Sequence, residues 1–292
     1  MTSTAGRASG ASGARRASGA RPAIRPDRAD PELARVESAL RELRVAAPVG
    51  LLPDTLVAAG LADEYATIDT AIGPVWVAWN GRGVSALTQA VDGASFEADF
   101  RRSHDRPIRP ASDGLPPRLA DAIHRRLGGD RRVRIAVDLR GHGEFQQAVW
   151  MKALEIPRGE VRPYGWVAAE IGRPAAVRAV GTALAHNPVP LVIPCHRVVR
   201  TDGRIGQYSL GGAENKRTLL AWEGADPDGL ERLASAGIRY IGSDTTRIVC
   251  HPTCHNARRV TDRHRVSFHS LGEAGQRGYR PCKVCRPVSL AA

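Results

Sequence analysis

The sequence contains no run of about 18 apolar residues, the length that a membrane-spanning helix requires. It also lacks an apolar segment within residues 1–30, so nothing there has the hydrophobic centre of a secretory signal. Acidic residues are absent before Asp27. These absences argue against a membrane-embedded or exported protein, and we expect a protein of the cytoplasm.

Cysteine is scarce: there are five, and four of them lie between Cys250 and Cys285. An odd number with this clustering does not fit the disulfide framework of a small secreted protein. The pattern indicates a reducing compartment, one metal cluster and one separate thiol, Cys195.

Positive charge, by contrast, is in excess. Lys and Arg number 42 against 30 Asp and Glu, which gives a formal net charge of +12. Such a balance favours a polyanionic partner, of which nucleic acid is the usual one. Solvated arginine-rich faces would give the same composition, so charge alone leaves both interpretations open.

The 292 residues are enough for about two domains, and composition divides them further. Residues 1–30 are rich in Ser, Gly, Ala and Arg, which predicts a disordered basic tail; a transit peptide would share this composition but should be amphipathic. Residues 31–62 are expected to form a helical linker segment. Residues 63–140 are expected to form a small α+β scaffold domain.

Two features define the predicted sheet of that scaffold. Asn80-Gly81 is typical of a hairpin turn, here between strands Val75–Trp79 and Val84–Leu87. Val133–Leu139 is predicted to be a further strand.

Residues 141–228 carry a helical pattern. Gly165–Ile171 and Ala175–His186 are predicted helices, joined by the turn Gly172-Arg173-Pro174, in which Pro174 is well placed to open the second helix. Two helices joined in this way resemble a helix-turn-helix. The second helix is rich in small residues, which would let it enter a DNA groove or pack tightly against another helix. Both interpretations are open.

Cys195 lies just downstream in a segment that cannot be helical, because Pro188, Pro190 and Pro194 interrupt it. His196 and Arg197 follow directly. A thiol must lose its proton to become a good nucleophile, and a nearby base or positive charge favours that loss. Since most lone cysteines are inert core residues, these neighbours alone leave an inert Cys195 open.

The surrounding motifs resemble those of the O6-alkylguanine-DNA alkyltransferase family. The matches occur in the family's order and cover about 80 residues. They are Gly159-Glu160-Val161, Tyr164, Arg178-Ala179-Val180-Gly181, Asn187-Pro188-Val189-Pro190, Pro194-Cys195-His196-Arg197-Val198, Gly206-Gln207-Tyr208-Ser209 and Trp222-Glu223-Gly224.

This resemblance implies a role for each matching residue. Cys195 would attack the alkyl carbon, His196 would draw away the thiol proton through a water, and Glu223 would orient the histidine. Tyr164 would donate a proton to the departing guanine, and Asn187 would brace the cysteine turn. The DNA contacts would come from a helix-turn-helix in the minor groove, with Arg178 filling the gap left by the flipped base. The residues implied to contact DNA are Arg178, Ala179, Gly181, Tyr208, Ser209 and Arg197.

Each of these residues also has a plainer explanation. Arg178 would serve equally as a phosphate anchor or a solvated helix residue, and Tyr164, Tyr208 and Glu223 as packing or surface residues. If the alkyl transfer is correct, the product is a thioether that no proton transfer can cleave. Each molecule would then act once.

A second constellation, Cys250-x3-Cys254 and Cys282-x2-Cys285, predicts a tetrahedral zinc site with four thiolate ligands, with an iron–sulfur cluster as the alternative. The surrounding residues resemble the metal-binding domain of Ada-type proteins, notably Asp244-Thr245-Thr246-Arg247, Pro252-Thr253-Cys254 and Gly278-Tyr279-Arg280-Pro281-Cys282. In that family the first cysteine, here Cys250, also accepts methyl groups from DNA phosphotriesters.

Two departures limit this second resemblance. The Ada arrangement places the metal domain first, and its helical activating segment after the zinc site is not found here. We therefore expect residues 229–292 to form a zinc module that contacts DNA, with Arg258, Arg259, Arg263, His264 and Arg265 as candidate phosphate contacts.

Together these patterns predict an α+β protein with a scaffold domain, an alkyltransferase domain and a zinc module. The predicted function is single-turnover DNA repair by a monomer that acts on double-stranded DNA containing O6-alkylguanine. The alternatives are a lesion-binding protein without enzymatic activity and an Ada-like regulator. Cys195 argues against the first, and no extra recognition domain is found for the second.

Overall fold

The computed structural model describes residues 32, 35–36, 38–39 and 51–289. The chain divides into two compact units, residues 1–48 and 49–292. The described residues before position 50 are helical; the predicted basic tail and residues 31, 33–34, 37 and 40–50 of the predicted linker segment lie outside the described residues. The second unit carries all the elements discussed below. None of the helices that the structure describes is long and apolar enough to cross a membrane.

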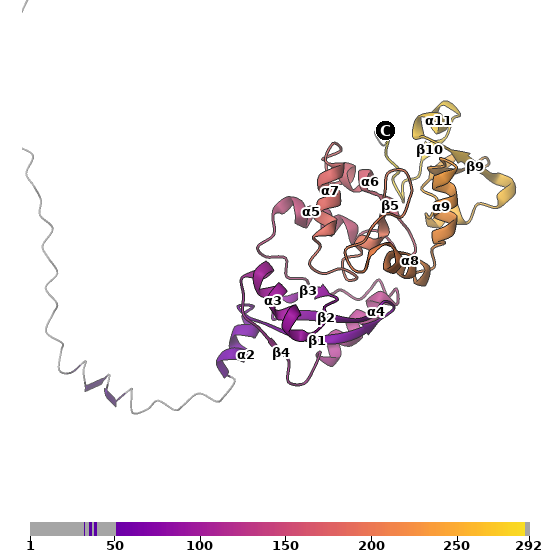
Figure 1. The fold of residues 1–292 in the computed structure, drawn as a ribbon. Coiled ribbons are helices and arrows are strands. Elements are labelled where there is room, and N and C mark those ends of the chain that lie inside the picture. The colour runs from indigo at the N-terminus through magenta and orange to yellow at the C-terminus, as the bar shows by residue number, and fades with distance from the viewer. Residues whose placement is uncertain (1–31, 33–34, 37, 40–50, 290–292) are drawn as a thin grey trace, which may run out of the picture. The chain divides into compact units, whose positions relative to one another are not determined.

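The second unit opens with α2 (Leu51–Ala58) and a sheet in the order β3-β2-β1-β4 (Figure 1). Its strands are β1 (Asp63–Thr70), β2 (Gly73–Asn80), β3 (Gly83–Thr88) and β4 (Ile108–Pro110). β1, β2 and β3 pair antiparallel, and β4 runs parallel to β1. This confirms the α+β class.

The predicted hairpin between β2 and β3 is confirmed, with its turn one residue later than expected. Asn80 pairs with Gly83, so the loop residues are Gly81 and Arg82. Asn80 stays in the strand because its buried side-chain amide donates to Asp63 at 2.8 Å and to Asp138 at 2.9 Å.

The strand predicted over Val133–Leu139 is wrong. This segment makes a single bridge, between Val137 and Val84, through hydrogen bonds at Ala136 and Asp138. The edge of β3 is shared: farther along, Leu87 N–H donates to Pro188 O at 2.8 Å instead. The segment at Pro188 therefore occupies the part of the β3 edge with which a longer strand over 133–139 would have to pair.

Helices cover both faces of this sheet. α3 (Gly93–His104) packs Phe96 and Phe100 against Tyr65 and Ile108. On the other side, Val75, Val77 and Leu87 join a continuous core with α4 (Pro117–Leu127), α5 (Glu144–Ala153), α6 (Tyr164–Glu170) and α7 (Val177–Ala185).

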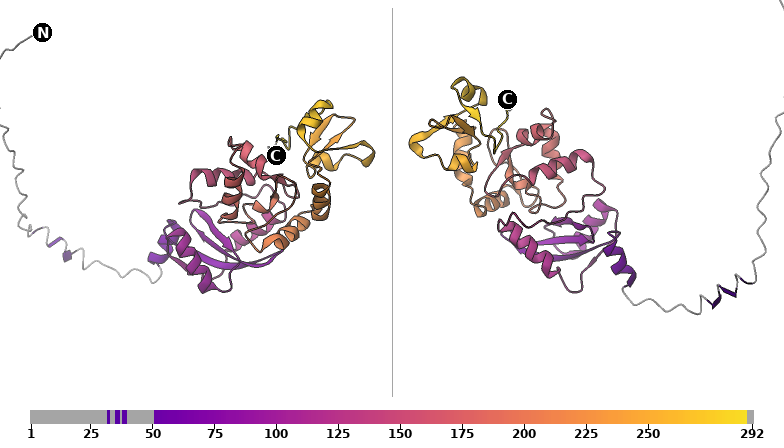
Figure 2. Two further views of the ribbon diagram at one scale, coloured as in Figure 1. Left: turned by 45° about the horizontal axis from the view of Figure 1, so that its top comes forward. Right: turned by 180° about the vertical axis from the view of Figure 1, so that it is seen from behind.

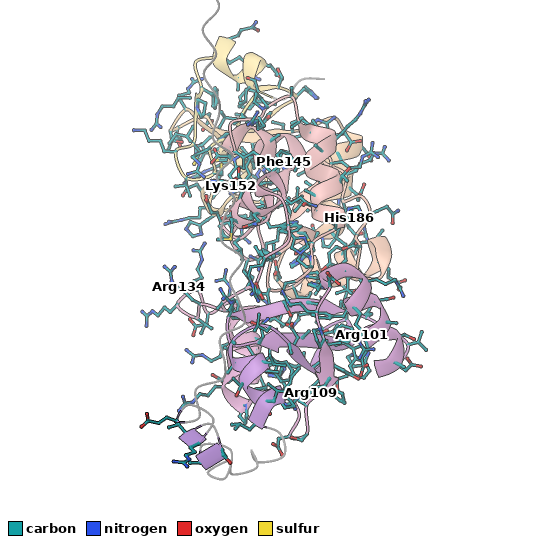
Figure 3. All side chains as sticks on the ribbon, turned by 90° about the vertical axis from the view of Figure 1, so that its left-hand side faces the viewer. Arg101, Arg109, Arg134, Phe145, Lys152 and His186 are labelled. Atoms are coloured by element: carbon teal, nitrogen blue, oxygen red, sulfur yellow. The ribbon has the colours of Figure 1, made fainter. Side chains whose placement is uncertain are left out.

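About half of the arginines of the N-terminal sheet region, residues 63–140, lie in ion pairs. Arg101 on α3 pairs with Glu97, and Arg109 on β4 pairs with Glu64 (Figure 3). Arg134 has no ion pair among the described residues. The composition therefore reflects solvated, paired faces as well as free cations.

Two of the predicted helices, α6 and α7, follow one another, but α7 begins later than predicted. Arg173 O accepts from Ala176 N–H in a turn that contains Pro174, so the first helical residue is Val177 rather than Ala175. The Trp150 indole on α5 donates to Ala183 O at 2.8 Å, which fixes α7 against the core.

After the cysteine segment the chain forms η1 (Cys195–Arg197) and β6 (Val198–Val199), which pairs with β5 (Arg162–Pro163). α8 (Gly212–Trp222) and α9 (Pro227–Ser235) lead to a second sheet in the order β10-β8-β7-β9, which lies beyond α9 (Figure 2). Residues 238–288, here called the cysteine module, contain β7 (Tyr240–Ser243), β8 (Ile248–Cys250), α10 (His255–Arg258), η2 (Asp262–His264), β9 (Arg265–Phe268), α11 (Leu271–Gln276) and β10 (Arg280–Pro281).

Candidate active site and metal centre

Asn187 braces the turn that carries Cys195. Its side-chain amide donates to Ile193 O and to Cys195 Sγ, both at 3.0 Å, and its Oδ1 accepts from Val189 N–H. Leu191, between them, has φ +71°, a left-handed conformation that tightens the loop. The sequence-predicted pair of Asn187 and Cys195 therefore meets in one buried turn.

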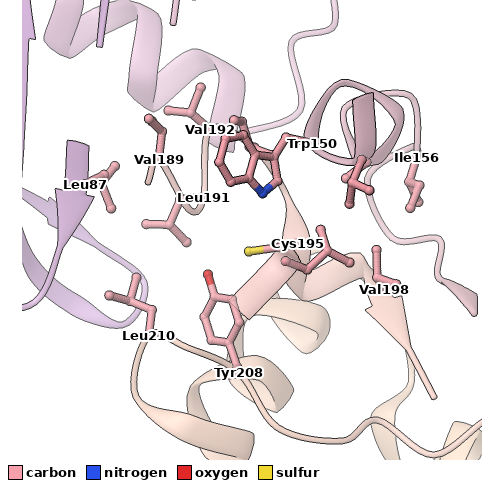
Figure 4. Packing of buried hydrophobic residues seen from close by; sticks show 14 of the residues in the cluster. Leu87, Trp150, Ile156, Val189, Leu191, Val192, Cys195, Val198, Tyr208 and Leu210 are labelled. Atoms are coloured by element: carbon pink, nitrogen blue, oxygen red, sulfur yellow. The ribbon is translucent and has the colours of Figure 1, made fainter. Parts of the chain in front are cut away.

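Cys195 is only 5% exposed and is packed in the apolar core. Figure 4 shows it pointing toward the Tyr208 hydroxyl, with Leu191 and Val198 nearby. Burial raises the pKa of the Cys195 thiol, although the Asn187 amide and the Lys216 ammonium act in the opposite direction. The resting residue is a neutral thiol, so the reaction requires a base.

His196 and Glu223 supply an arrangement that fits a base. His196 Nε2 lies 3.0 Å from Glu223 Oε1. Although burial alone raises the pKa of Glu223, hydrogen bonds from His196 and Arg197 lower it to about 2. An ionised carboxylate only accepts, so Nε2 carries the proton and Nδ1 keeps its lone pair.

That second nitrogen is free for a proton. His196 Nδ1 is buried and has no hydrogen-bond partner among the described residues. Burial lowers the pKa of His196, and Glu223 opposes this shift. A neutral imidazole oriented by a carboxylate is the arrangement of a general base.

The structure contradicts the predicted DNA contact of Arg197. Its guanidinium is buried and contacts Glu223 Oε1 at 2.6 Å, Oε2 at 2.9 Å and Ile156 O at 2.7 Å. A buried carboxylate requires a compensating charge, and Arg197 provides it. The residue therefore stabilises Glu223 and faces away from solvent.

Sequence reasoning missed Lys216. Its ammonium is buried beneath the cysteine segment and donates to Val198 O at 2.7 Å and to Gln207 O at 3.3 Å. Burial lowers its pKa to about 8. A signal existed in the sequence, because Lys216 shares a helical face with the buried Leu219 and Leu220.

The predicted DNA-contacting residues lie mostly at the surface around α7. Tyr164, Arg178 and Gly181 border a hollow of about 990 Å³, here called the α7 groove. Arg178 and Ala179 are exposed, as is Ser209, whereas its neighbour Tyr208 is buried. Burial raises the pKa of Tyr164, as does the negative charge of an ionised Cys195.

The four remaining cysteines come together as predicted. The sulfur atoms of Cys250, Cys254, Cys282 and Cys285 all lie within 4.8 Å of one another. Two N–H groups point at these sulfurs, from His251 to Cys285 and from Asn256 to Cys282, each at 3.4 Å. Such donors compensate thiolate charge, so the donor set fits a tetrahedral zinc ion. Bound zinc would keep the sulfurs as thiolates and link β8 to the segment after β10.

The cysteine module docks on the active-site region through polar contacts. Thr253, between the first two cysteines, accepts from Val161 N–H at 2.8 Å. His255 N–H donates to Glu160 Oε1 at 3.0 Å, and Glu160 also pairs with Arg162 at 2.5 Å. The preceding Gly159 N–H donates to Glu223 at 3.3 Å. One short segment therefore contacts both cysteine sites.

One zinc cysteine also borders a hollow. Cys250 lines a space of about 520 Å³ together with Thr246, Asn256, Arg259 and Arg263. Among the predicted phosphate contacts, Arg258, Arg259, Arg263 and Arg265 are exposed, whereas His264 contacts Asp244 at 2.9 Å.

Comparisons with known proteins agree with this geometry. Residues 144–225 match the family described as 6-O-methylguanine DNA methyltransferase, DNA binding domain, and residues 232–288 match the metal binding domain of Ada. The match to the second family and the clustered sulfurs identify a zinc site with cysteine ligands.

Individual relatives agree as well. The methylated-DNA–protein-cysteine methyltransferase of Mycobacterium tuberculosis is 39% identical over 161 residues, which are 55% of this chain and 92% of the relative. The bifunctional transcriptional activator/DNA repair enzyme Ada of Escherichia coli is 36% identical over 54% of this chain and 45% of its own length. A crystal structure of Mycobacterium tuberculosis OGT in complex with DNA is similar, with 36% identity, a TM-score of 0.46, and coverage of 57% of this chain and 98% of that chain. On the identity and coverage of the first relative, this chain belongs to the methylated-DNA–protein-cysteine methyltransferase family.

Proposed function

We propose that this protein repairs DNA by transferring the alkyl group of O6-alkylguanine irreversibly to Cys195. The observation that carries the proposal is the buried Cys195 thiol beside His196, whose imidazole is oriented by the ionised Glu223. The related methyltransferases are named for this chemistry, which takes the methyl group from DNA. Double-stranded DNA is therefore the partner, and we expect the activity in the compartment that holds it, the cytoplasm in a bacterial cell.

The chemical step balances with residues of this chain. The Cys195 proton passes through a water to His196 Nδ1, and the thiolate attacks the alkyl carbon. A carbon–sulfur bond forms while the carbon–O6 bond breaks, and its electron pair stays with guanine. Tyr164 supplies the proton that makes guanine a neutral leaving group. The thioether product cannot revert, so each molecule acts once.

DNA recognition is assigned to the surface above the cysteine. α7, with Ala179 and Gly181 on it, enters the minor groove, and Arg178 fills the gap left by a flipped nucleotide at an unstacking cost of roughly a few kcal/mol. Because Cys195 is 5% exposed, the loop that carries Tyr208 and Ser209 must move to admit the base. In this proposal residues 63–140, 141–228 and 229–292 are the scaffold, alkyltransferase and zinc domains.

Intact-mass analysis after exposure to an O6-methylguanine duplex tests the proposal. We expect one methyl per chain, located on Cys195, and none in Cys195→Ala. Folding of the variant is checked by its zinc content and circular dichroism. A wild-type protein that takes up no methyl, or that removes several methyl groups per chain, would contradict it.

The hollow beside Cys250 favours a second activity, transfer of methyl from DNA phosphotriesters to this cysteine. Arg259 and Arg263 would contact the flanking phosphates, which retain their charge. Peptide mass spectrometry after treatment with methylphosphotriester DNA lacking O6-methylguanine should find methyl on Cys250 alone. Methyl on none of the four cysteines would leave the module a DNA-contacting structure only.

A further inference from the structure

We propose that the cysteine module forms the second wall of the α7 groove, so that a duplex bound on α7 also contacts the module through Arg239 and His269. This inference rests on the proposed binding of DNA by α7. It assigns to the cysteine module a DNA contact that is separate from the hollow at Cys250.

The walls of the groove come from segments far apart in the sequence. Arg178 and Gly181 line it from α7, Arg200 from the segment after β6, and Arg239, His269 and Ser270 from the cysteine module. The volume of about 990 Å³ is open to solvent on the face that carries the exposed Arg178. A duplex that follows α7 therefore meets both walls.

Direct contacts fix the two walls relative to one another. Arg286 of the cysteine module pairs with Glu170 at 2.6 Å, and its carbonyl accepts from the Trp166 indole at 3.1 Å. Both partners lie on α6, the helix just before α7. Together with the contact between Thr253 and Val161, these bonds hold the cysteine module beside the helix-turn-helix.

The charges around the groove suit phosphate groups. Arg178 and Arg239 lie on opposite walls, and neither has an ion pair within the described part of the chain. Arg239 Nη1 is partly enclosed against Gly203 and lacks any hydrogen-bond partner among those residues. The single acid of the lining, Asp202, pairs with Arg200 at 3.0 Å, and it interacts with Arg239 only from beyond ion-pair distance.

An unpaired, half-buried guanidinium is costly unless an anion approaches it. Phosphates along one strand would be such anions, because a helix in the minor groove is flanked by the two backbones. The repeated negative charge of a duplex reaches both walls at once, whereas a single small anion would contact only one. This favours the backbone of the same duplex that α7 binds.

Binding of an undamaged duplex at several salt concentrations tests the inference. Arg239→Gln should weaken binding about tenfold at low salt and reduce the slope of log affinity against log salt by about 1. The matched control is Arg280→Gln, which removes the same charge from an exposed strand residue outside the groove and should leave affinity nearly unchanged. Unchanged zinc content verifies that the variants are folded.

The outcomes separate this inference from the proposed function. If the wild-type protein accepts methyl on Cys195 but Arg239→Gln binds like Arg280→Gln, the second wall is wrong while the repair activity stands. Equal weakening in both variants would indicate net charge alone and would also overturn it. Should Arg239→Gln lose zinc, His269→Gln replaces it, and wild-type affinity in that variant overturns the inference. Absence of methyl transfer in the wild-type protein counts against the proposed function instead.

Discussion

Two buried Cys-His pairs in this protein have the same sequence and different surroundings. Cys195-His196 lies in the turn braced by Asn187, and Cys250-His251 ends β8. All four side chains are at most 5% exposed, and each histidine has one buried ring nitrogen with no partner among the described residues. Neither the dipeptide nor its burial can therefore decide which pair performs chemistry.

The two pairs differ in the group that lies beside the histidine. His196 contacts the carboxylate of Glu223, whereas His251 packs near the Tyr240 ring and has Arg162 as a charged neighbour. Burial, and then Arg162, lower the pKa of His251 to about 3. The sulfurs differ as well, because Cys195 has an amide neighbour and Cys250 has three other sulfurs. In the proposed function the carboxylate makes the first pair a relay, whereas the sulfur cluster makes the second pair part of a metal site.

Zinc removal should disrupt the surroundings of Cys250-His251 and leave those of Cys195-His196 intact. The buried core around Ile241 and Ala257 is built largely from the cysteines, so the cysteine module should unfold without metal. Structural zinc contributes an apparent ~10–16 kcal/mol in small domains. Hydrogen exchange before and after chelation should show protection lost over β7–β10 and restored by zinc. Full protection without metal would contradict this.

Glu223→Gln should remove the feature that distinguishes His196 from His251. Without the carboxylate the imidazole becomes a weaker base, and single-turnover methyl transfer should slow on the order of 10²–10⁴-fold. The variant leaves Arg197 buried without its partner, so rates are compared at a temperature where circular dichroism shows it folded. His251→Gln is the matched control and should transfer at the wild-type rate. If methyl transfer slowed equally in Glu223→Gln and His251→Gln, Glu223 would not be what distinguishes the two histidines.

The pKa of Glu223 predicts how stability depends on pH. The folded pKa of about 2 is below the ordinary 4.5, so ionised Glu223 stabilises the folded state above the ordinary pKa. This contribution, about 3 kcal/mol, is lost as the pH falls from about 4.5 through about 2. Urea unfolding across acidic pH should show the loss in the wild-type protein and a shallower one in Glu223→Gln. Parallel pH profiles would assign the acid lability to other groups.

Thr253→Val should give the smallest effect, at the contact between the two sites. It keeps the shape of the side chain but leaves Val161 N–H buried without its acceptor, which should cost about 1–3 kcal/mol. Thr246→Val, at an exposed position of the same module, should change the unfolding free energy by less than about 0.5 kcal/mol. Urea denaturation measures both. Equal changes in unfolding free energy for the two variants would mean that the contact of Thr253 with Val161 does not stabilise the junction between the cysteine module and the Cys195 site.

Sequence patterns predicted the parts of the site whose residues carry their own signature. The proline-interrupted segment around Cys195 and the spacing of the cysteine pairs each depend on local chemistry, and the clustered sulfurs confirm the second. Arg197 was misassigned, because its sequence neighbours could not show that Glu223 lies beside it. Lys216 and Thr253 were missed because their partners are backbone groups, which look alike in every sequence.

The errors in the fold have the same origin. Val133–Leu139 has the composition of a strand, but whether it pairs depends on Pro188 occupying part of the same edge. Ala175 and Ala176 favour helix, but the turn at Arg173 delays its start. Both outcomes were set by competition for hydrogen bonds, which local propensity does not contain.

Gly159 lies where the two sulfur chemistries adjoin. Its φ is +72°, and a Cβ there would lie 2.8 Å from Glu223 O and 3.5 Å from Arg258 Nη1. A side chain would therefore clash with the backbone of Glu223, whereas its distance from Arg258 is an ordinary contact, so the strain falls on the Glu223 side alone. A single methyl group at this position would displace the carbonyl of the residue that holds His196, while the zinc cysteines kept their places.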